Sequence, residues 1–183
     1  LMVTAGRLPL HGVMPLSQTL DSPGPIAKTI LDCLIMFEVL DGREGWQITR
    51  DMEKDDGTYA ILNKGVSGLR LGSLNESERQ QCSDDVLASY DMALDRLRLM
   101  GAEIITFENP VSYGDMADDN GMITAVEAFH NHGYLYKNPD LPMDEDVRAR
   151  MLSGGRYHAH DYFGILEQRK ETMQAFGESM RGF

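Results

Sequence analysis

Four of the five histidines stand in two His-x-His pairs, and paired imidazoles suit a metal ion. The pairs are His130 with His132 and His158 with His160. This spacing puts both rings on one side of a strand but about 200° apart on a helix. His130 and His132 lie in a helical pattern, so we expect them to diverge, while His158 and His160 lie at a looser helix start. We therefore predict no metal or other cofactor, with a site on the paired histidines as the less favoured alternative.

Arg148 and Arg150 are the residues best suited to hold an anionic substrate group. An arginine binds a carboxylate through two parallel hydrogen bonds, so either residue could do this. The alternative is a solvated helix face, with Asp144 and Asp146 one turn earlier at i, i+4. The spacing favours the solvated face.

Other motifs lack the pattern that their chemistry needs. Gly65, Gly68 and Gly72 do not form a G-x-G-x-x-G phosphate loop. Residues 153–155, Ser-Gly-Gly, lack the first glycine of a nucleophile elbow and read as a helix stop. The acids at 144–146 suit a helix first turn better than paired-carboxylate catalysis. Residue chemistry alone predicts no catalytic set.

The charge of the chain excludes classes of partner. Its 183 residues hold 17 Lys and Arg against 29 Asp and Glu, a formal net charge of −12. Nucleic acids and anionic membranes need clustered basic residues, so we predict neither as a partner. Two cysteines cannot build a disulfide framework. The most apolar run, residues 30–40, is interrupted by Asp32 and Glu38, so we expect no segment that spans a bilayer. With no basic segment before an apolar stretch at the start, we expect a cytoplasmic protein.

The first part of the chain predicts one short strand and one buried helix. Residues 12–16 suit a strand, and Pro15 limits them to an edge strand or to the end of a strand. A turn at residues 21–25 precedes a helix over 26–40, ended by Asp41-Gly42. This helix is apolar nearly all round, which is typical of a helix covered by other protein. Residues 43–67 are polar and carry Asp55-Asp56-Gly57, so we expect a long surface excursion.

A strand, a helix and a second strand follow at the spacing of a βαβ unit within 68–107. The strands are expected over 68–72 and 102–107, and the helix over 84–100, with Ser83 as its cap and Gly101 as its end. The apolar face of that helix comprises Val86, Tyr90, Ala93, Leu94, Leu97 and Met100.

Residues 111–183 are mainly helical, with helices expected over 121–136, 144–152 and 159–180. The fold class is therefore α/β, with a mixed sheet flanked by helices. We expect one partial domain over 1–183, with strands and helices in 1–110. Both ends of the chain look cut, and an uncovered apolar helix predicts association of the isolated chain, so a homo-oligomer is a possible state.

The sequence resembles the amidase signature family in several motifs that occur in the family's order. The specific ones lie near the start: Thr4-x-Gly6-Arg7, Gly12-Val13-Met14-Pro15-Leu16-Ser17 and Leu20-Asp21-x-x-Gly24-Pro25. Weaker ones follow: residues 68–72, Glu127 to His132, Val147 to Met151, Gly154, Asp161-Tyr162 and Arg169.

The resemblance implies hydrolysis of carboxylic amides to an acid plus ammonia or an amine. The family uses a lysine and two serines, one of them after a cis peptide bond, and a serine forms the acyl-enzyme. These residues precede the Thr-x-Gly-Arg motif in the family, so here they would lie before Leu1, and no catalytic residue is assigned within 1–183. We expect the chain alone to be inactive and the parent protein to act on a small-molecule amide. Arg150 matches a position that binds a substrate carboxylate in some relatives.

Two other functions fit the sequence as well. One is the glutaminase-type subunit of a tRNA-dependent amidotransferase, which shares the fold that the resemblance implies. The other is a non-catalytic α/β module for binding or assembly. A lysine and a Gly/Ser-rich loop in frame before Leu1 would favour an enzyme over this module.

Overall fold

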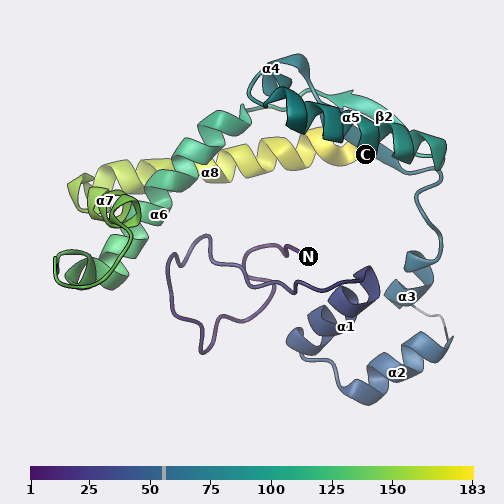
Figure 1. Ribbon diagram of the computed structural model, residues 1–183, viewed down its shortest axis with the longest axis horizontal. Helices are drawn as coiled ribbons and strands as arrows, with labels where there is room; N and C mark the ends of the chain where they lie inside the picture. Colours follow the sequence, from purple (N-terminus) through teal and green to yellow (C-terminus); the bar gives the residue numbers. More distant parts are fainter. Residues whose placement is uncertain (55–56) are drawn as a thin grey trace. The chain divides into compact units, whose positions relative to one another are not determined.

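The computed structural model describes residues 1–54 and 57–183 (Figure 1). Its contacts divide the chain into two compact units. The first unit comprises Leu1–Ala60 and Asp118–Leu166, and the second comprises Ile61–Ala117 and Glu167–Phe183. Asp55 and Asp56, which we expected within a surface excursion, lie outside the described residues.

The first 29 residues of the first unit contain neither helix nor strand (Figure 1). The strand expected at 12–16 is therefore wrong. Gly12 has φ 81°, and the Val13 N–H donates to the Leu10 carbonyl over 3.0 Å, so the backbone turns where a strand would continue. Leu8 and Ser17 anchor this irregular segment, because both side chains are buried.

Helix α1, Ile30–Leu40, begins four residues later than expected. Thr29 stops it from beginning earlier, because Thr29 has extended backbone and its hydroxyl accepts from the Asp32 N–H over 3.0 Å. Its end at Asp41-Gly42 is confirmed, with Gly42 at φ 88°. Within the described residues, however, only Leu34 and Glu38 of this helix are buried, so most of its apolar surface is open.

The polar region 43–67 is more regular than expected. It contains helix α2, Gly45–Lys54, and helix α3, Gly57–Leu62. Ile48 and Tyr59 bury their side chains against Leu34 of α1. One apolar anchor in each helix is too weak a pattern to stand out in a polar sequence, which explains why the pattern did not predict these helices.

Three helices complete the chain: α6, Tyr113–Tyr136; α7, Glu145–Ser153; and α8, Ala159–Ser179. Helices α7 and α8 fall within one residue of the expected bounds, whereas α6 begins eight residues early. Asp144 caps α7 by accepting the N–H groups of Asp146 and Val147. In the first unit, the buried residues Ala128 and Tyr136 of α6 form a core with Met151 of α7.

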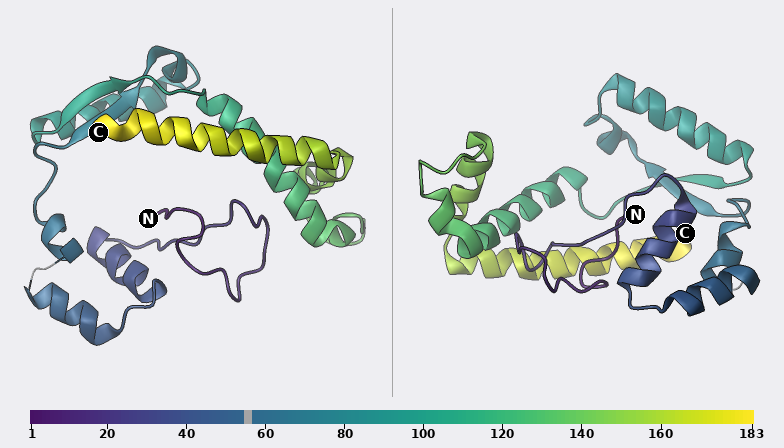
Figure 2. Two further views of the ribbon diagram at one scale, coloured as in Figure 1. Left: turned by 180° about the vertical axis from the view of Figure 1, so that it is seen from behind. Right: turned by 60° about the horizontal axis from the view of Figure 1, so that its bottom comes forward.

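The second unit is built on a parallel strand pair, β1, Arg70–Leu74, and β2, Glu103–Phe107, with Leu71 opposite Ile104. Helices α4, Glu76–Arg79, and α5, Asp84–Leu99, separate the strands in sequence, and α5 lies along one face of the pair (Figure 2). The predicted strand–helix–strand order is therefore confirmed, with β1 displaced by two residues.

Only part of the expected apolar face of α5 is covered. Leu94 is buried, whereas Val86 and Met100 are exposed. Ser83 occupies the cap position without a side-chain hydrogen bond, and Gly101 ends the helix at φ 95°.

Aromatic side chains close the core of the second unit. Phe107, the last residue of β2, has its ring centroid 6.0 Å from that of Phe176 and 5.4 Å from that of Phe183. An added Cβ at Gly72 would lie 3.0 Å from the Phe107 side chain, so β1 needs a small residue here. The α/β class is confirmed, with a small parallel sheet and a mainly helical remainder.

Candidate functional site

Glu127 is the buried carboxylate around which the first unit assembles a polar site. It lies on α6, and its residue is only 5% exposed. Neighbouring Ile123 and Ala128 are fully buried on the same helix. A carboxylate in such a position has to be hydrogen-bonded, because burying an unpaired charge is strongly unfavourable.

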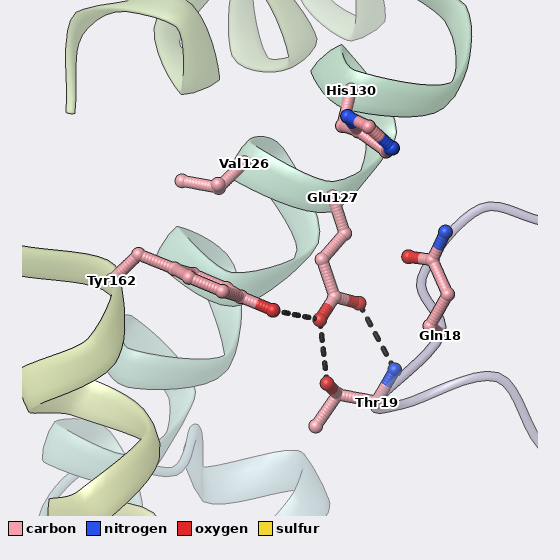
Figure 3. Close-up of a pocket in the computed structure, with 6 residues that line it drawn as sticks. All are labelled: Gln18, Thr19, Val126, Glu127, His130 and Tyr162. Atoms are coloured by element: carbon pink, nitrogen blue, oxygen red, sulfur yellow. Dashed lines mark hydrogen bonds between the residues drawn. The ribbon is translucent and has the colours of Figure 1, made fainter. Parts of the chain in front are cut away.

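The carboxylate accepts four hydrogen bonds, and Figure 3 shows the three that come from Thr19 and Tyr162. Oε1 accepts from the Thr19 hydroxyl at 2.5 Å and from the Tyr162 hydroxyl at 2.6 Å. Oε2 accepts from the Thr19 N–H at 3.0 Å and from the Ser17 hydroxyl. Glu127 therefore joins the irregular segment around Ser17 to helices α6 and α8. With its lone pairs occupied in this way, it is poorly placed to act as a general base.

These bonds determine the ionisation of the site. Burial opposes the charged form of Glu127, but the bonds from Ser17, Thr19 and Tyr162 outweigh it and lower the pKa of the carboxyl below its ordinary 4.5. Burial, together with the bond to Glu127, raises the pKa of the Tyr162 hydroxyl above 10.0. At neutral pH the site therefore contains an anion and a protonated phenol.

A pocket of about 410 Å³ lies beside this carboxylate. Its lining residues come from the irregular segment, α6 and α8, and are Gln18, Thr19, Val126, Glu127, His130 and Tyr162 (Figure 3). Val126 and the Tyr162 ring supply apolar surface. The other four supply polar groups, so the pocket can hold a small molecule with both an apolar part and a polar part.

The two arginines have different surroundings. Arg148 was expected on a solvated face, but it is buried. Its guanidinium donates to the carbonyls of Tyr136, Asn138 and Leu141, and its Nε lies 3.1 Å from the Glu145 carboxylate. It therefore fixes the end of α6 and the loop that follows.

Arg150, our predicted substrate-binding residue, is exposed. Its Nε donates to the Asp146 carbonyl over 3.3 Å, and Arg150 does not line the Glu127 pocket. The structure therefore leaves its predicted role untested.

The four paired histidines also have different surroundings. His130 lines the pocket, whereas Nε2 of His132 lies 2.6 Å from the Pro15 carbonyl oxygen. The rings of His158 and His160 stack, with centroids 5.6 Å apart. Across residues 1–54 and 57–183, no three His, Cys, Asp or Glu side chains gather as a metal site would require.

The glycines at 154 and 155 serve close packing as well as a helix stop. Helix α7 ends at Ser153, and a 3-10 turn, Gly154–Arg156, follows. An added Cβ at Gly154 would lie 2.0 Å from the Ala125 carbonyl oxygen of α6, so no larger residue fits there. The prediction of a helix stop instead of a nucleophile elbow is confirmed.

The structure brings together residues from three separate motifs of the sequence: Ser17, Glu127 and Tyr162. In the sequence all three stood out only as part of a resemblance, with no role assigned to them. The available signal was Glu127 itself, a lone carboxylate on an otherwise apolar helix face. Gln18 and Thr19 carried no such signal, because irregular backbone has no period that predicts which side chains turn inward.

Among the described residues, none of the helices has the length and hydropathy of a membrane span.

A family model described as Amidase matches residues 3–182. A protein from Pseudomonas putida named Amidase is 29% identical over 96% of this chain and 37% of its own length. One subunit of the glutamyl-tRNA(Gln) amidotransferase from Paraburkholderia xenovorans is 31% identical over 97% of this chain and 42% of its own length.

Solved structures share the fold. A structure described as "Crystal structure of amidase" superposes with a TM-score of 0.77 at 20% identity, covering 99% of this chain and 38% of that one. Another, described as "An unexpected vestigial protein complex reveals the evolutionary origins of an s-triazine catabolic enzyme", has a TM-score of 0.78 at 19% identity. It covers 100% of this chain and 39% of that one. The chain thus spans about two fifths of the length of these proteins.

Proposed function

We propose that this chain, which belongs to the amidase family, is part of an enzyme that hydrolyses carboxylic amides to an acid plus ammonia or an amine. The observation that carries the proposal is the family match over residues 3–182, nearly the whole chain. The Glu127 site supports it, because it joins motifs that resemble the family across more than 100 residues of sequence. We further propose that residues 1–183 form part of one larger domain.

The catalytic set belongs, in this proposal, to sequence outside these 183 residues. The family's lysine and two serines activate a nucleophilic hydroxyl, and backbone N–H groups of a Gly/Ser-rich loop stabilise the oxyanion. No residue of the present chain matches those positions. The role of the chain is then to build a wall of the domain and to support the site.

Release of ammonia or amine from a panel of small carboxylic amides tests the proposal. We expect no turnover by the purified 183-residue chain. We expect turnover by the protein translated from the complete reading frame, abolished when its predicted nucleophilic serine becomes alanine. A complete protein without a lysine and Gly/Ser-rich loop, and without amide hydrolysis, would contradict the proposal. Serine-dependent turnover by residues 1–183 alone would contradict the proposal that the catalytic residues lie outside this chain.

Arg150 is our proposed contact for a substrate carboxylate. Its exposure leaves the guanidinium accessible, and a bidentate bond to a carboxylate contributes about 1.5–3 kcal/mol. In the complete enzyme, Arg150→Ala should raise KM about tenfold or more for an amide bearing a carboxylate, with little change for a neutral amide. Arg156→Ala, another exposed arginine nearby, is the control. An unchanged KM in Arg150→Ala would refute this role.

A glutaminase-type subunit of a tRNA-dependent amidotransferase is the second candidate. It is favoured by the 31% identity to the Paraburkholderia amidotransferase protein over nearly the whole chain. The two candidates differ in the amide that they prefer. Glutamine as the best substrate of the complete protein would favour the amidotransferase, and simple aliphatic or aryl amides would favour a general amidase.

The proposal also covers the location, the partners and the oligomeric state of the enzyme. We propose a cytoplasmic protein that acts on a small-molecule amide and forms a homo-oligomer, with no nucleic acid bound by this chain. The net charge of −12 supports the exclusion of nucleic acid. Sedimentation of the complete protein would test the oligomeric state.

A further inference from the structure

We propose that the pocket beside Glu127 binds a primary ammonium group. The proposal concerns a ligand site within the first unit and does not depend on amide hydrolysis. It follows from the sign of the charge at Glu127 and from the direction of the hydrogen bonds that Thr19, Tyr162 and Gln18 make.

The charge of Glu127 has no cationic partner within the described residues. All four of its hydrogen-bond donors are neutral: three hydroxyls and one backbone N–H. None of the ion pairs among the described residues of the first unit includes Glu127. Neutral dipoles stabilise a buried anion but leave its net charge in place. The pocket therefore favours a cation and disfavours a carboxylate or phosphate.

The hydroxyls in the wall can act only as acceptors toward a ligand. Thr19 and Tyr162 each have one hydroxyl proton, and each donates it to Oε1 of Glu127. What remains on both oxygens is acceptor capacity. A ligand that needs to receive hydrogen bonds would have to take these protons from Glu127, which would leave a buried anion with fewer bonds.

The Gln18 amide adds a third acceptor. Its Nε2 donates to Oδ1 of Asn131 over 2.7 Å, and Nδ2 of Asn131 donates to the Leu16 carbonyl over 3.2 Å. These two bonds fix the orientation of the Gln18 amide, so that its oxygen turns toward Glu127 and its nitrogen turns away (Figure 3). Three oxygen acceptors beside a negative charge match the three N–H donors of a primary ammonium.

The rest of the wall suits the carbon chain of such a ligand. Val126 and the ring of Tyr162 supply apolar surface, and an aromatic face also attracts a cation. The volume of about 410 Å³ lies in the range of sites for small molecules. Either a free amine or a lysine side chain of another polypeptide carries the required group.

Titration of the protein translated from the complete reading frame with n-propylammonium chloride at constant ionic strength, followed by NMR, tests the site. We expect saturable shifts confined to the lining residues, the Gln18 side-chain amide among them. n-Propanol and propionate should give no such shifts, since the first lacks the charge and the second has the wrong sign. Tighter binding of Nα-acetyl-lysine amide, whose ε-ammonium is free, than of n-propylammonium would identify a lysine side chain as the source of the group.

Two variants separate this site from general attraction to an acidic protein. Glu127→Gln should weaken binding by about fivefold or more, because it removes the local charge. Glu171→Gln makes the same change in net charge at an exposed position and should leave the affinity within about twofold. If Glu127→Gln does not fold, Gln18→Leu removes one acceptor and keeps all four bonds to Glu127. It should weaken binding by about threefold or more.

Three results would overturn the proposal. They are equal shifts with n-propanol, no saturable shift with n-propylammonium, and unchanged affinity in a folded Glu127→Gln or Gln18→Leu variant. None of these results involves turnover of an amide. Failure of the ammonium site is therefore distinguishable from failure of the proposed hydrolysis.

Discussion

At the scale of single residues, two buried carboxylates among the described residues of the first unit, Glu127 and Glu38, are stabilised in different ways. Glu127 relies on neutral donors, three hydroxyls and one backbone N–H. Glu38 of α1 accepts from Arg43 at 2.6 Å and from the Tyr59 hydroxyl at 2.7 Å, so a cation balances its charge. Arg43 also bonds Asp51, which extends the ion pair into a network between α1 and α2. The uncompensated anion therefore lies beside the pocket, and the compensated one lies in the packing of the small helices.

Replacing Glu127 by glutamine should change how the free energy of unfolding depends on pH. The pKa of Glu127 is lowered in the folded chain, so its contribution is present above the ordinary value near 4.5 and is lost as pH falls through the folded pKa. Denaturant unfolding from pH 7 to pH 2 should show a smaller slope in Glu127→Gln than in the native chain. At pH 7 the variant should lose about 1–3 kcal/mol, since the amide NH2 faces hydroxyls that donate. Glu171→Gln should keep the native slope, and an equally steep slope in Glu127→Gln would contradict this role.

Replacing Tyr59 by phenylalanine should destabilise the packing of α1, α2 and α3. The change removes one of the donors to buried Glu38, at a cost of about 1–2 kcal/mol in the free energy of unfolding. Burial, with the bond to Glu38, raises the pKa of Tyr59 to about 12. The native chain should therefore also lose stability as pH rises from about 10 toward 12, and Tyr59→Phe should lose less. Tyr134→Phe, at a residue 72% exposed, is the control and should show no effect at pH 7.

How much of the site was predictable depends on the local structure of each residue. Glu127 could be recognised because helical periodicity places it on an apolar face, where a carboxylate needs partners. Its partners could not be derived from pattern, since Ser17 and Tyr162 lie 110 and 35 residues away and meet it only through tertiary contacts. Arg148 shows the opposite error. Its acidic neighbour Asp144 at i−4 suggested a solvated face, but backbone carbonyls at the end of α6 and in the loop that follows bind it instead.

At the scale of elements, local sequence signals located a helix boundary where a glycine follows the helix or a polar residue precedes it. Gly42 and Gly101 end α1 and α5 with positive φ, and Asp144 caps α7. The errors occur where tertiary contacts decide. Helices α2 and α3 depend on single buried residues, Ile48 and Tyr59, and residues 12–16 have the composition of a strand but no strand beside them.

Gly154 tests how closely helices α6 and α7 have to approach. Gly154→Ala would put a methyl group 2.0 Å from the Ala125 carbonyl oxygen, and backbone cannot move aside as a flexible side chain can. We expect a loss of about 1–3 kcal/mol or more in the free energy of unfolding. Gly164→Ala is the matched control, because an added Cβ there meets nothing within 4 Å and alanine favours a helix. Equal stability of Gly154→Ala and the native chain would show that the two helices separate easily.

At the scale of the whole molecule, the open apolar surface of α1 agrees with the share of the family fold that the chain spans. Ile30 is 75% exposed and Val39 is 55% exposed, on a helix whose composition is typical of a buried one. The chain covers only 38% of the solved amidase that it resembles. Composition predicted that this helix needs a cover, but it could not predict which polypeptide supplies it.

The isolated 183-residue chain should therefore associate in solution. Contiguous exposed apolar surface favours self-contact, although the net charge of −12 opposes it at low salt, so association should increase with salt concentration. Sedimentation velocity at rising protein concentration should show species larger than 20.5 kDa. The double variant Ile30→Glu with Val39→Glu should shift the distribution toward monomer. Leu99→Glu, at an exposed apolar residue on α5, should shift it less. A native chain that stays monomeric at high salt and at about 100 μM would contradict the prediction, because surface of this kind would then be tolerated without a cover.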